Sequence, residues 1–207
     1  YPLLSYESVI LGSINLSKHL KGDAAFREID YDKLQKTIHL AVRFLDDATE
    51  VNGFPLRQTR EIVSGNRKIG LSIMGFADVL FMLRIAYDSR KALNLAEKIM
   101  SFIETESRLA SKMLAKERGV FLNYDDSLLK SKGAEFKQRN ATLTAISPTG
   151  TISLIASCSP SIEPIYGISF LRKTSRFEFL EVNPYFEEVA KEKGLLNEKE
   201  KEIALEW

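Results

Sequence analysis

The chain has 207 residues, 44% of them hydrophobic, so it is long enough to bury a core and is expected to form a single domain over residues 1–207. Its 29 basic and 28 acidic residues give a net charge of +1, which argues against a broad nucleic-acid or anionic-membrane interface. The single cysteine, Cys158, excludes an internal disulfide and favours a reducing compartment, so the cytoplasm is the expected location. No apolar run approaches the roughly 20 residues that span a bilayer. The opening at Tyr1, without Met and running straight into an apolar segment, suggests a piece of a longer polypeptide.

The first quarter of the chain predicts a strand followed by a long helix. Residues 9–11 and the Gly-Ser-Ile-Asn-Leu segment at 12–16 are typical of a buried strand that leads into a tight turn. Asp30 is expected to cap a helix that ends before Asn52-Gly53. The core face of that helix is predicted from helical spacing, with Leu34, Ile38, Ala41, Leu45 and Ala48.

A shorter helix and a second strand are expected next. The helix follows Pro55, and alternating apolar residues between Arg67 and Phe76 predict the strand. Gly70 and Gly75 are interpreted as positions of close backbone approach rather than as a nucleotide-binding glycine loop, because no Lys-Ser or Lys-Thr follows Gly75.

The longest periodic segment predicts an outer helix from Arg90 to Arg118, with Gly119 as its C-cap. Its predicted core face is Ala92, Ala96, Ile99, Ile103, Ala110 and Met113. A polar stretch at 125–137 follows, then a strand at 142–146, a second short strand at 165–170, and a charged helical tail from Asn183. Alternating strands and helices predict an α/β fold with mainly parallel strands.

The strand at 142–146 runs directly into Ser-Pro-Thr-Gly-Thr-Ile-Ser at 147–153. Pro148 fixes one turn dihedral, Gly150 permits a positive φ, and hydroxyl residues flank amides that can converge at a helix start. Such a turn binds phosphate without a lysine, although an ordinary strand-to-helix turn with hydroxyl capping is the alternative interpretation of the tripeptide by itself.

Four separated segments together resemble the large chain of ribonucleotide reductase, closest to its adenosylcobalamin-dependent class. They are Pro-Leu-Leu-Ser-Tyr-Glu-Ser at 2–8 with Leu-Gly-Ser-Ile-Asn-Leu at 11–16, Asn-Arg-Lys-Ile-Gly-Leu-Ser-Ile-Met-Gly-Phe-Ala-Asp at 66–78, the Pro-Thr-Gly stretch, and Ser-Ile-Glu-Pro at 161–164. The resemblance covers roughly residues 1–175, with the segments in the family's order and spacing.

This resemblance implies that the chain is the second half of a ten-stranded α/β barrel. It implies a substrate diphosphate site at Thr149, Gly150, Thr151, Ile152 and Ser153, and adenosylcobalamin as the cofactor of the complete enzyme. The family loop with the radical cysteine and the carboxylate base would sit just before Tyr1, so no catalytic residue is expected on this chain.

Two departures from the family pattern concern thiols. Val9 stands where the family has one cysteine of the dithiol that reduces the substrate, and the chain ends at Trp207 without a terminal Cys pair. The chain alone is therefore expected to be inactive. Its expected partners are a ribonucleotide and the N-terminal half of the reductase, from another chain or the same longer polypeptide, with a homodimer as a further expectation.

Other candidate residues favour structural roles. Cys158 is interpreted as a small buried filler, and His19 and His39, without ligand-spaced neighbours, as surface or capping residues rather than a metal site. Asp46-Asp47 and Asp125-Asp126 are interpreted as solvated faces. Glu163 is left open between a loop-orienting role and a structural salt bridge.

Three functions follow from these patterns. The first is a part of a ribonucleotide reductase that supplies the substrate-phosphate loop. The second is a non-catalytic nucleotide-binding paralogue, which the valine at position 9 favours. The third, a scaffolding protein, requires the Pro-Thr-Gly loop to be silent toward nucleotides.

Overall fold

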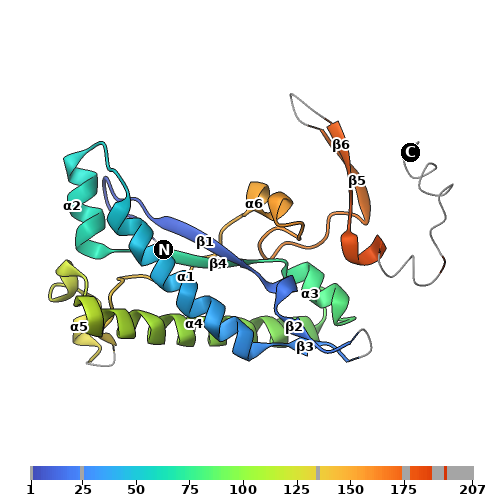
Figure 1. Cartoon of the computed structure of the whole chain (residues 1–207), viewed down its shortest axis with the longest axis horizontal. Coiled ribbons are helices and arrows are strands. Elements are labelled where there is room, and N and C mark those ends of the chain that lie inside the picture. The colour runs from blue at the N-terminus through green and yellow to red at the C-terminus, as the bar shows by residue number, and fades with distance from the viewer. Residues whose placement is uncertain (1, 24–25, 134–135, 174–177, 188–193, 195–207) are drawn as a thin grey trace.

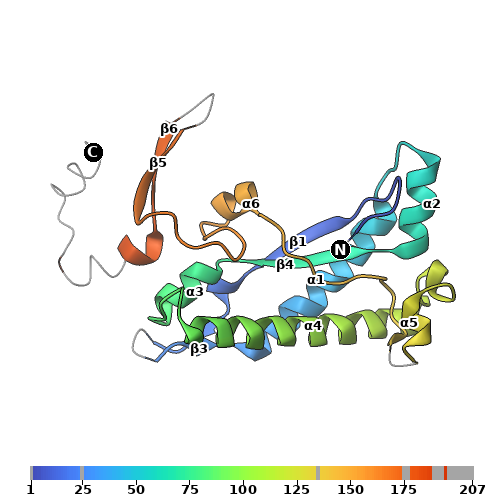
Figure 2. The same ribbon diagram turned by 180° about the vertical axis from the view of Figure 1, so that it is seen from behind.

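The computed structural model describes residues 2–23, 26–133, 136–173, 178–187 and 194. A body of two long helices and a strand pair is accompanied by a hairpin that stands apart from it in both views (Figures 1 and 2). None of the described helices is long and apolar enough to cross a membrane. The elements in chain order are β1 (Ile10–Asn15), the 3-10 turn η1 (Leu16–Lys18), β2 (Leu20–Lys21), β3 (Glu28–Ile29), α1 (Tyr31–Val51), α2 (Arg57–Asn66), β4 (Ile69–Met74), α3 (Phe76–Met82), α4 (Arg90–Arg118), η2 (Leu122–Tyr124), α5 (Leu128–Ser131), α6 (Gly150–Ile155), β5 (Ser169–Lys173) and β6 (Glu178–Val182).

The strands β1 and β4 are parallel neighbours, in register from Ile10 opposite Ile69 to Asn15 opposite Met74. The connection between them runs through α1 and α2, as a parallel pair requires. β4 is buried at all six positions, whereas β1 is buried only at Ile14 and leaves Leu11 50% exposed. The expectation of a buried first strand was therefore wrong, because within the described residues β1 has a strand neighbour on one side only.

The extended segment 142–147 lies along the other edge of β4. The Leu71 amide donates to Leu143 O (2.7 Å), and the Ala145 amide donates to Leu71 O (3.0 Å). This pairing amounts to one parallel bridge, so the regular strand expected at 142–146 is not formed. The Ser147 amide donates instead to the Ser72 hydroxyl (3.0 Å), which takes the chain off the backbone ladder.

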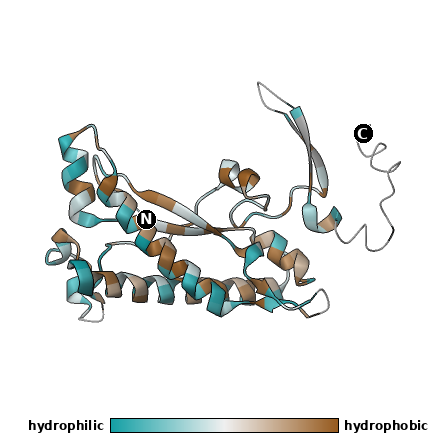
Figure 3. Cartoon of the chain, in the orientation of Figure 1, coloured by the Kyte–Doolittle hydropathy of each residue, from teal (hydrophilic) through white to brown (hydrophobic). Residues whose placement is uncertain are grey.

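The helices α1 and α4 begin and end where the sequence predicts. Asp30 accepts from the Lys33 amide (3.0 Å) at the start of α1, and Gly119 ends α4. In Figure 3 both helices alternate hydrophobic and hydrophilic bands, as expected for helices with one buried face. One predicted core residue was wrong: Met113 is 48% exposed, and Leu114, four residues after Ala110, continues the buried face instead.

The apolar core lies between these two helices and the strand pair. Leu34, Ile38, Val42 and Leu45 come from α1, Ile69, Leu71 and Ile73 from β4, and Ile99, Ile103 and Leu114 from α4. Ala41 and Ala48, predicted for the core face of α1, are only partly buried. The centre of that face is taken by the bulkier Val42 and by Thr49.

Two of the three strand pairs in the described residues are antiparallel, so the expectation of mainly parallel strands holds for β1 with β4 and for the bridge from Leu71 to Thr144. The strand expected at 165–170 begins later, at Ser169, since Pro164 and Gly167 disfavour ladder pairing before it. After β6, Asn183 accepts from the amides of Tyr185 and Phe186 (3.0 Å each), a helix cap where the helical tail was expected. Most of that tail, 188–193 and 195–207, lies outside the described residues.

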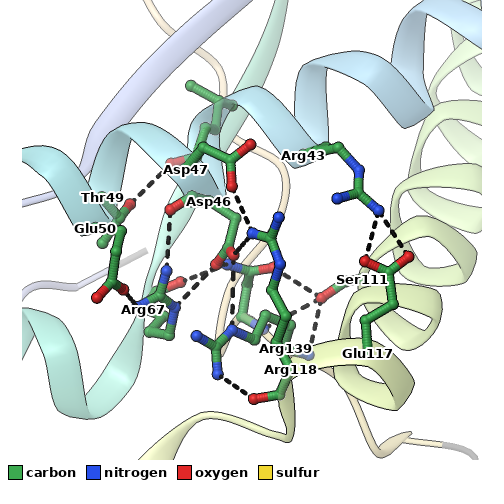
Figure 4. A network of polar contacts seen from close by, with 12 residues as sticks. Arg43, Asp46, Asp47, Thr49, Glu50, Arg67, Ser111, Glu117, Arg118 and Arg139 are labelled. Atoms are coloured by element: carbon green, nitrogen blue, oxygen red, sulfur yellow. Dashed lines mark hydrogen bonds and ion pairs between the residues drawn. The ribbon is translucent and has the colours of Figure 1, made fainter.

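A buried ionic network joins α1, the start of β4 and the end of α4 (Figure 4). The fully buried Asp46 carboxylate accepts from Arg67 Nε (2.9 Å), Arg118 Nη1 (3.0 Å) and Asn140 Nδ2 (3.0 Å). Asp46 was therefore wrongly assigned to a solvated face: three arginines converge on it from distant segments, including Arg139 at 3.6 Å. The assignment holds for the exposed Asp125, which pairs with Lys130 (2.6 Å).

Candidate functional site

A cavity of about 590 Å³ lies beside α6. Its walls are formed by residues of the segment from Pro148 to Gly167, by Asp78 in the first turn of α3, and by residues 182–184 at the end of the hairpin. The cavity lies beyond the carboxyl ends of the two parallel strands. Asn15, the last residue of β1, donates from Nδ2 to Ala156 O (3.3 Å), and Gly75, directly after β4, donates to Ser159 O (2.7 Å). Ligand sites of open α/β sheets lie at this edge.

Thr149 and Gly150 shape the turn at the start of α6. Thr149 adopts the left-handed φ of 55°, and its side chain makes no capping bond to α6. The Thr149 hydroxyl instead accepts from the Ser161 amide (2.7 Å). Gly150 does not adopt the positive φ expected of it. Gly150 belongs to the lining of the cavity, and a Cβ there would meet no atom within 4 Å.

The five residues of the expected phosphate site come together in this one turn. Gly150 and Ser153 line the cavity, whereas Thr151 and Ile152 are exposed and do not belong to its lining. The Ser153 hydroxyl points back into the helix and donates to Gly150 O (3.2 Å). The first amides of a helix have no acceptor within the helix, so the donors that α6 offers to an anion are backbone N–H groups.

Charge at the cavity comes from carboxylates alone. Its described lining contains Asp78 and Glu163 but no Lys or Arg. Asp78 is buried and accepts from the Ser159 amide (2.5 Å) and from Asn183 Nδ2 (3.2 Å), so both of its oxygens have donors. Sequence reasoning assigned Asp78 no role, although the residue lies in a matched segment directly after a buried strand.

Glu163 accepts a hydrogen bond from the Tyr166 hydroxyl. The two residues are three positions apart in sequence, and both line the cavity. Of the two roles left open for Glu163, the contact supports the loop-orienting one.

Cys158 lines the same cavity and is partly buried. Burial, and then the neighbouring charge of Asp78, raise the pKa of the Cys158 thiol to about 11. The thiol is therefore protonated at neutral pH, which argues against a nucleophilic role and agrees with the predicted packing role.

Gly75 confirms the packing interpretation of its glycine segment. Its φ is +76°, and a Cβ there would lie 2.7 Å from Asn15 Oδ1 and 3.5 Å from Cys158 Cβ. Glycine therefore allows the end of β4 to lie this close to the Asn15 side chain at the end of β1.

Val9 lies half-buried directly before β1, at the opposite end of that strand from α6. Six strand residues separate the two ends, about 20 Å of extended chain. The position that the resemblance assigns to a reducing cysteine thus lies apart from the expected phosphate turn.

The histidines form no metal site in the described residues, where no cluster of three potential ligands occurs. Of the two roles expected for His19, surface or capping, the structure supports capping: His19 is the C-cap residue of η1, and its amide donates to Leu16 O (2.9 Å). The side chain is buried, with Nδ1 2.9 Å from Asn15 O and Nε2 2.9 Å from Thr37 Oγ1. His39 pairs with Glu106 (2.8 Å). His19 thus joins the end of β1 to α1, and His39 joins α1 to α4.

Comparison with known proteins identifies the family. The model of the ribonucleotide reductase barrel domain matches residues 3–138 and 127–206. The chain is 50% identical over 198 residues to a vitamin B12-dependent ribonucleoside-diphosphate reductase of Thermoplasma acidophilum, covering 95% of this chain and 25% of that protein. A protein of the same description from Mycobacterium tuberculosis is 44% identical over 93% of this chain and 27% of its own length. The ribonucleoside-diphosphate reductase subunit alpha of Chlamydia pneumoniae is 33% identical over 89% of this chain and 21% of its own length.

The chain spans about a quarter of the length of these relatives. Its matched part includes the strand pair, the α6 turn and all three segments that line the cavity. The chain belongs to the ribonucleotide reductase barrel-domain family.

Proposed function

We propose that residues 1–207 form one domain, the second half of the ten-stranded barrel of a ribonucleotide reductase, and that Thr149–Ser153 bind the diphosphate of the substrate. The observation that carries this proposal is the α6 turn. Its first residue, Gly150, lines a cavity at the carboxyl ends of parallel strands, and a Cβ at Gly150 would meet no atom within 4 Å. Backbone amides at a helix start are donors suited to phosphate oxygens.

The reaction proposed for the assembled protein replaces the ribose 2′-hydroxyl by hydrogen. That change consumes two electrons and two protons and releases water, so a reductant must supply the electrons. We assign the radical cysteine, the carboxylate base and the remaining strands to the part that precedes Tyr1 in the family pattern, on the same longer polypeptide or on a second chain. By "assembled protein" we mean this chain together with that part. We expect it to act in the cytoplasm, with a homodimer as its further assembly.

Adenosylcobalamin is the cofactor proposed for the assembled protein, in line with the names of two relatives. The described residues of this chain do not fit a role in ligating its cobalt. Both nitrogens of the buried His19 are occupied, His39 is paired with Glu106, and the Cys158 thiol is protonated at neutral pH. We therefore propose no cobalt ligand among the described residues of this chain.

Val9 favours the second candidate function, a nucleotide-binding paralogue that does not reduce its ligand. A valine carries no thiol and cannot take part in a dithiol reduction. Phosphate recognition at α6 is common to both candidates, and deoxynucleotide formation separates them.

The test of the phosphate site is the affinity of the assembled protein for CDP, compared between wild type and Gly150→Val. Gly150 lines the cavity, has no positive φ and leaves open space for a Cβ, so the added side chain should crowd the phosphate turn without straining the backbone. Affinity should fall by about 1 to 3 kcal/mol while the fold persists. Gly53→Val is the matched control, because Gly53 is equally open but lies between α1 and α2. Equal CDP affinity in the two variants would contradict the assignment.

A further inference from the structure

Ser159 is bound to the first turn of α3 by all three of its polar groups. The Gly75 amide donates to Ser159 O (2.7 Å), and the Ser159 amide donates to Asp78 Oδ2 (2.5 Å). The Asp78 amide donates in return to the Ser159 hydroxyl (3.3 Å). Both residues are buried, so water offers little replacement for these bonds.

The second oxygen of Asp78 binds a third segment. Asp78 Oδ1 accepts from Asn183 Nδ2 (3.2 Å), and Asn183 Oδ1 accepts from the amides that follow β6. We call Asp78, Ser159 and Asn183 the Asp78 junction. It joins α3, the turn after α6 and the chain leaving the hairpin, and all three residues line the cavity.

The turn held by the junction also holds the expected phosphate site. Two residues after Ser159, the Ser161 amide donates to the Thr149 hydroxyl (2.7 Å). One residue before it, the Cys158 amide donates to Ser153 O (3.0 Å). Thr149 and Ser153 are the first and last residues of the proposed site, so a shift of Ser159 would be passed on to both ends.

We propose that Asp78 is a positioning residue that acts through Ser159 on the Thr149–Ser153 turn, and that it does so by its hydrogen bonds rather than by placing a negative charge beside the ligand. This inference rests on the proposed phosphate-binding function. Asp78 is 1% exposed and both of its oxygens have donors, so it has no free oxygen to offer to a substrate. One of its oxygens accepts from Ser159 and the other from Asn183, so the carboxylate joins the three segments by accepting hydrogen bonds.

The test exchanges the two side chains. Asp78→Asn places an amide nitrogen against Asn183 Nδ2, and Asn183→Asp places a second carboxylate against Asp78, so each single variant spoils the contact. In the double variant, the amide oxygen at position 78 accepts from the Ser159 amide, and the amide nitrogen there donates to the carboxylate at position 183. The other oxygen of that carboxylate still accepts from the amides of Tyr185 and Phe186. The exchange keeps every hydrogen bond and moves the charge. Asp88→Asn, at an exposed aspartate just before α4, is the matched control.

In the assembled protein, each single variant should raise the Kd for CDP about tenfold, the scale of a lost buried hydrogen bond. The double variant should return Kd to within about threefold of wild type. Single variants that match Asp88→Asn, or a double variant as impaired as the singles, would overturn the proposal. Should a single variant fail to fold, the double variant decides alone.

Hydrogen exchange separates failure of the junction from failure of the proposed function. A wild-type protein that binds no CDP refutes the phosphate site. The junction is then judged by exchange of the Ser159 and Ser161 amides in the same protein. Faster exchange in the single variants and recovery in the double variant support the positioning role, whereas equal exchange in all four proteins refutes it.

Discussion

Asp46→Asn should be among the most damaging single substitutions in the core of the chain. The wild-type carboxylate is fully buried and accepts from Arg67, Arg118 and Asn140 at 2.9 to 3.0 Å. An asparagine there can still accept with one atom, but its NH2 group faces a guanidinium donor, and the nearly buried Arg67 keeps only Glu50 as a carboxylate partner. Removal of one partner of a buried ion pair costs about 3 to 5 kcal/mol. We expect a loss of that size in urea denaturation at pH 7.

The pH dependence of this loss provides a second check. Burial alone would raise the pKa of Asp46, but hydrogen bonds from Arg67 and Asn140 and the nearby arginine charges hold that pKa below its ordinary value. A depressed folded-state pKa contributes stability that is present above the unfolded value, about 3.9, and lost as pH falls through the folded value. The gap between wild type and Asp46→Asn should therefore narrow below about pH 4. Asp125→Asn, at an exposed pair, should change stability by less than about 1 kcal/mol. Equal losses in the two variants, or a gap that does not change with pH, would refute this account of the network.

Three further perturbations test other parts of the molecule. Gly75→Ala should destabilise the fold by about 1 to 3 kcal/mol in the same assay, because a Cβ would meet Asn15 at a positive φ; a neutral effect would contradict the close approach of the two strand ends. Val9→Cys should cost under about 1.5 kcal/mol, and in an assembled protein carrying the partner cysteine it should increase thioredoxin-supported turnover, whereas equal turnover would mean that electrons reach the substrate by another route. The chain by itself should self-associate in sedimentation velocity, because the edge of β1 and apolar side chains such as Leu11 and Ile146 are exposed; a stable monomer with a sharp unfolding transition would count against the half-barrel model.

The helices of the body could be predicted from sequence because their signals are local. Asp30 and Gly119 mark helix ends by short-range hydrogen bonding, and the apolar spacing of α1 and α4 follows from one buried face. The predictions for strands were wrong where the structure depends on contacts between segments far apart in sequence. Ser72 diverts the chain from backbone pairing after Ala145, and the edge position of β1 depends on which strands lie beside it.

The candidate site could be predicted only in part, for the same reason. The turn at 149–153 is continuous in sequence, and its composition together with the family resemblance indicated it. Asp78 and Asn183 belong to the same cavity but lie 105 residues apart, so no local pattern connects them. The conformation of Thr149 was also missed, because turn chemistry predicted the positive φ at the neighbouring glycine. Thr149 adopts the left-handed φ, and its hydroxyl accepts from the amide of Ser161, twelve residues away in sequence.

The two ends of β4 are held in different ways, and together they fix the entry to the proposed phosphate turn. At the start of the strand, Asn140 donates to Asp46 and to Arg67 O (3.0 Å each), which fixes where the paired segment 142–147 begins. At the far end, Ser72 accepts from the Ser147 amide, and Gly75 and Asp78 bind Ser159. A functional turn on a rigid strand needs support at both ends, since a displacement of about 1 Å is enough to weaken a site. The ionic network is therefore expected to affect ligand binding only through the register of this segment, whereas the Asp78 junction affects it directly at the turn.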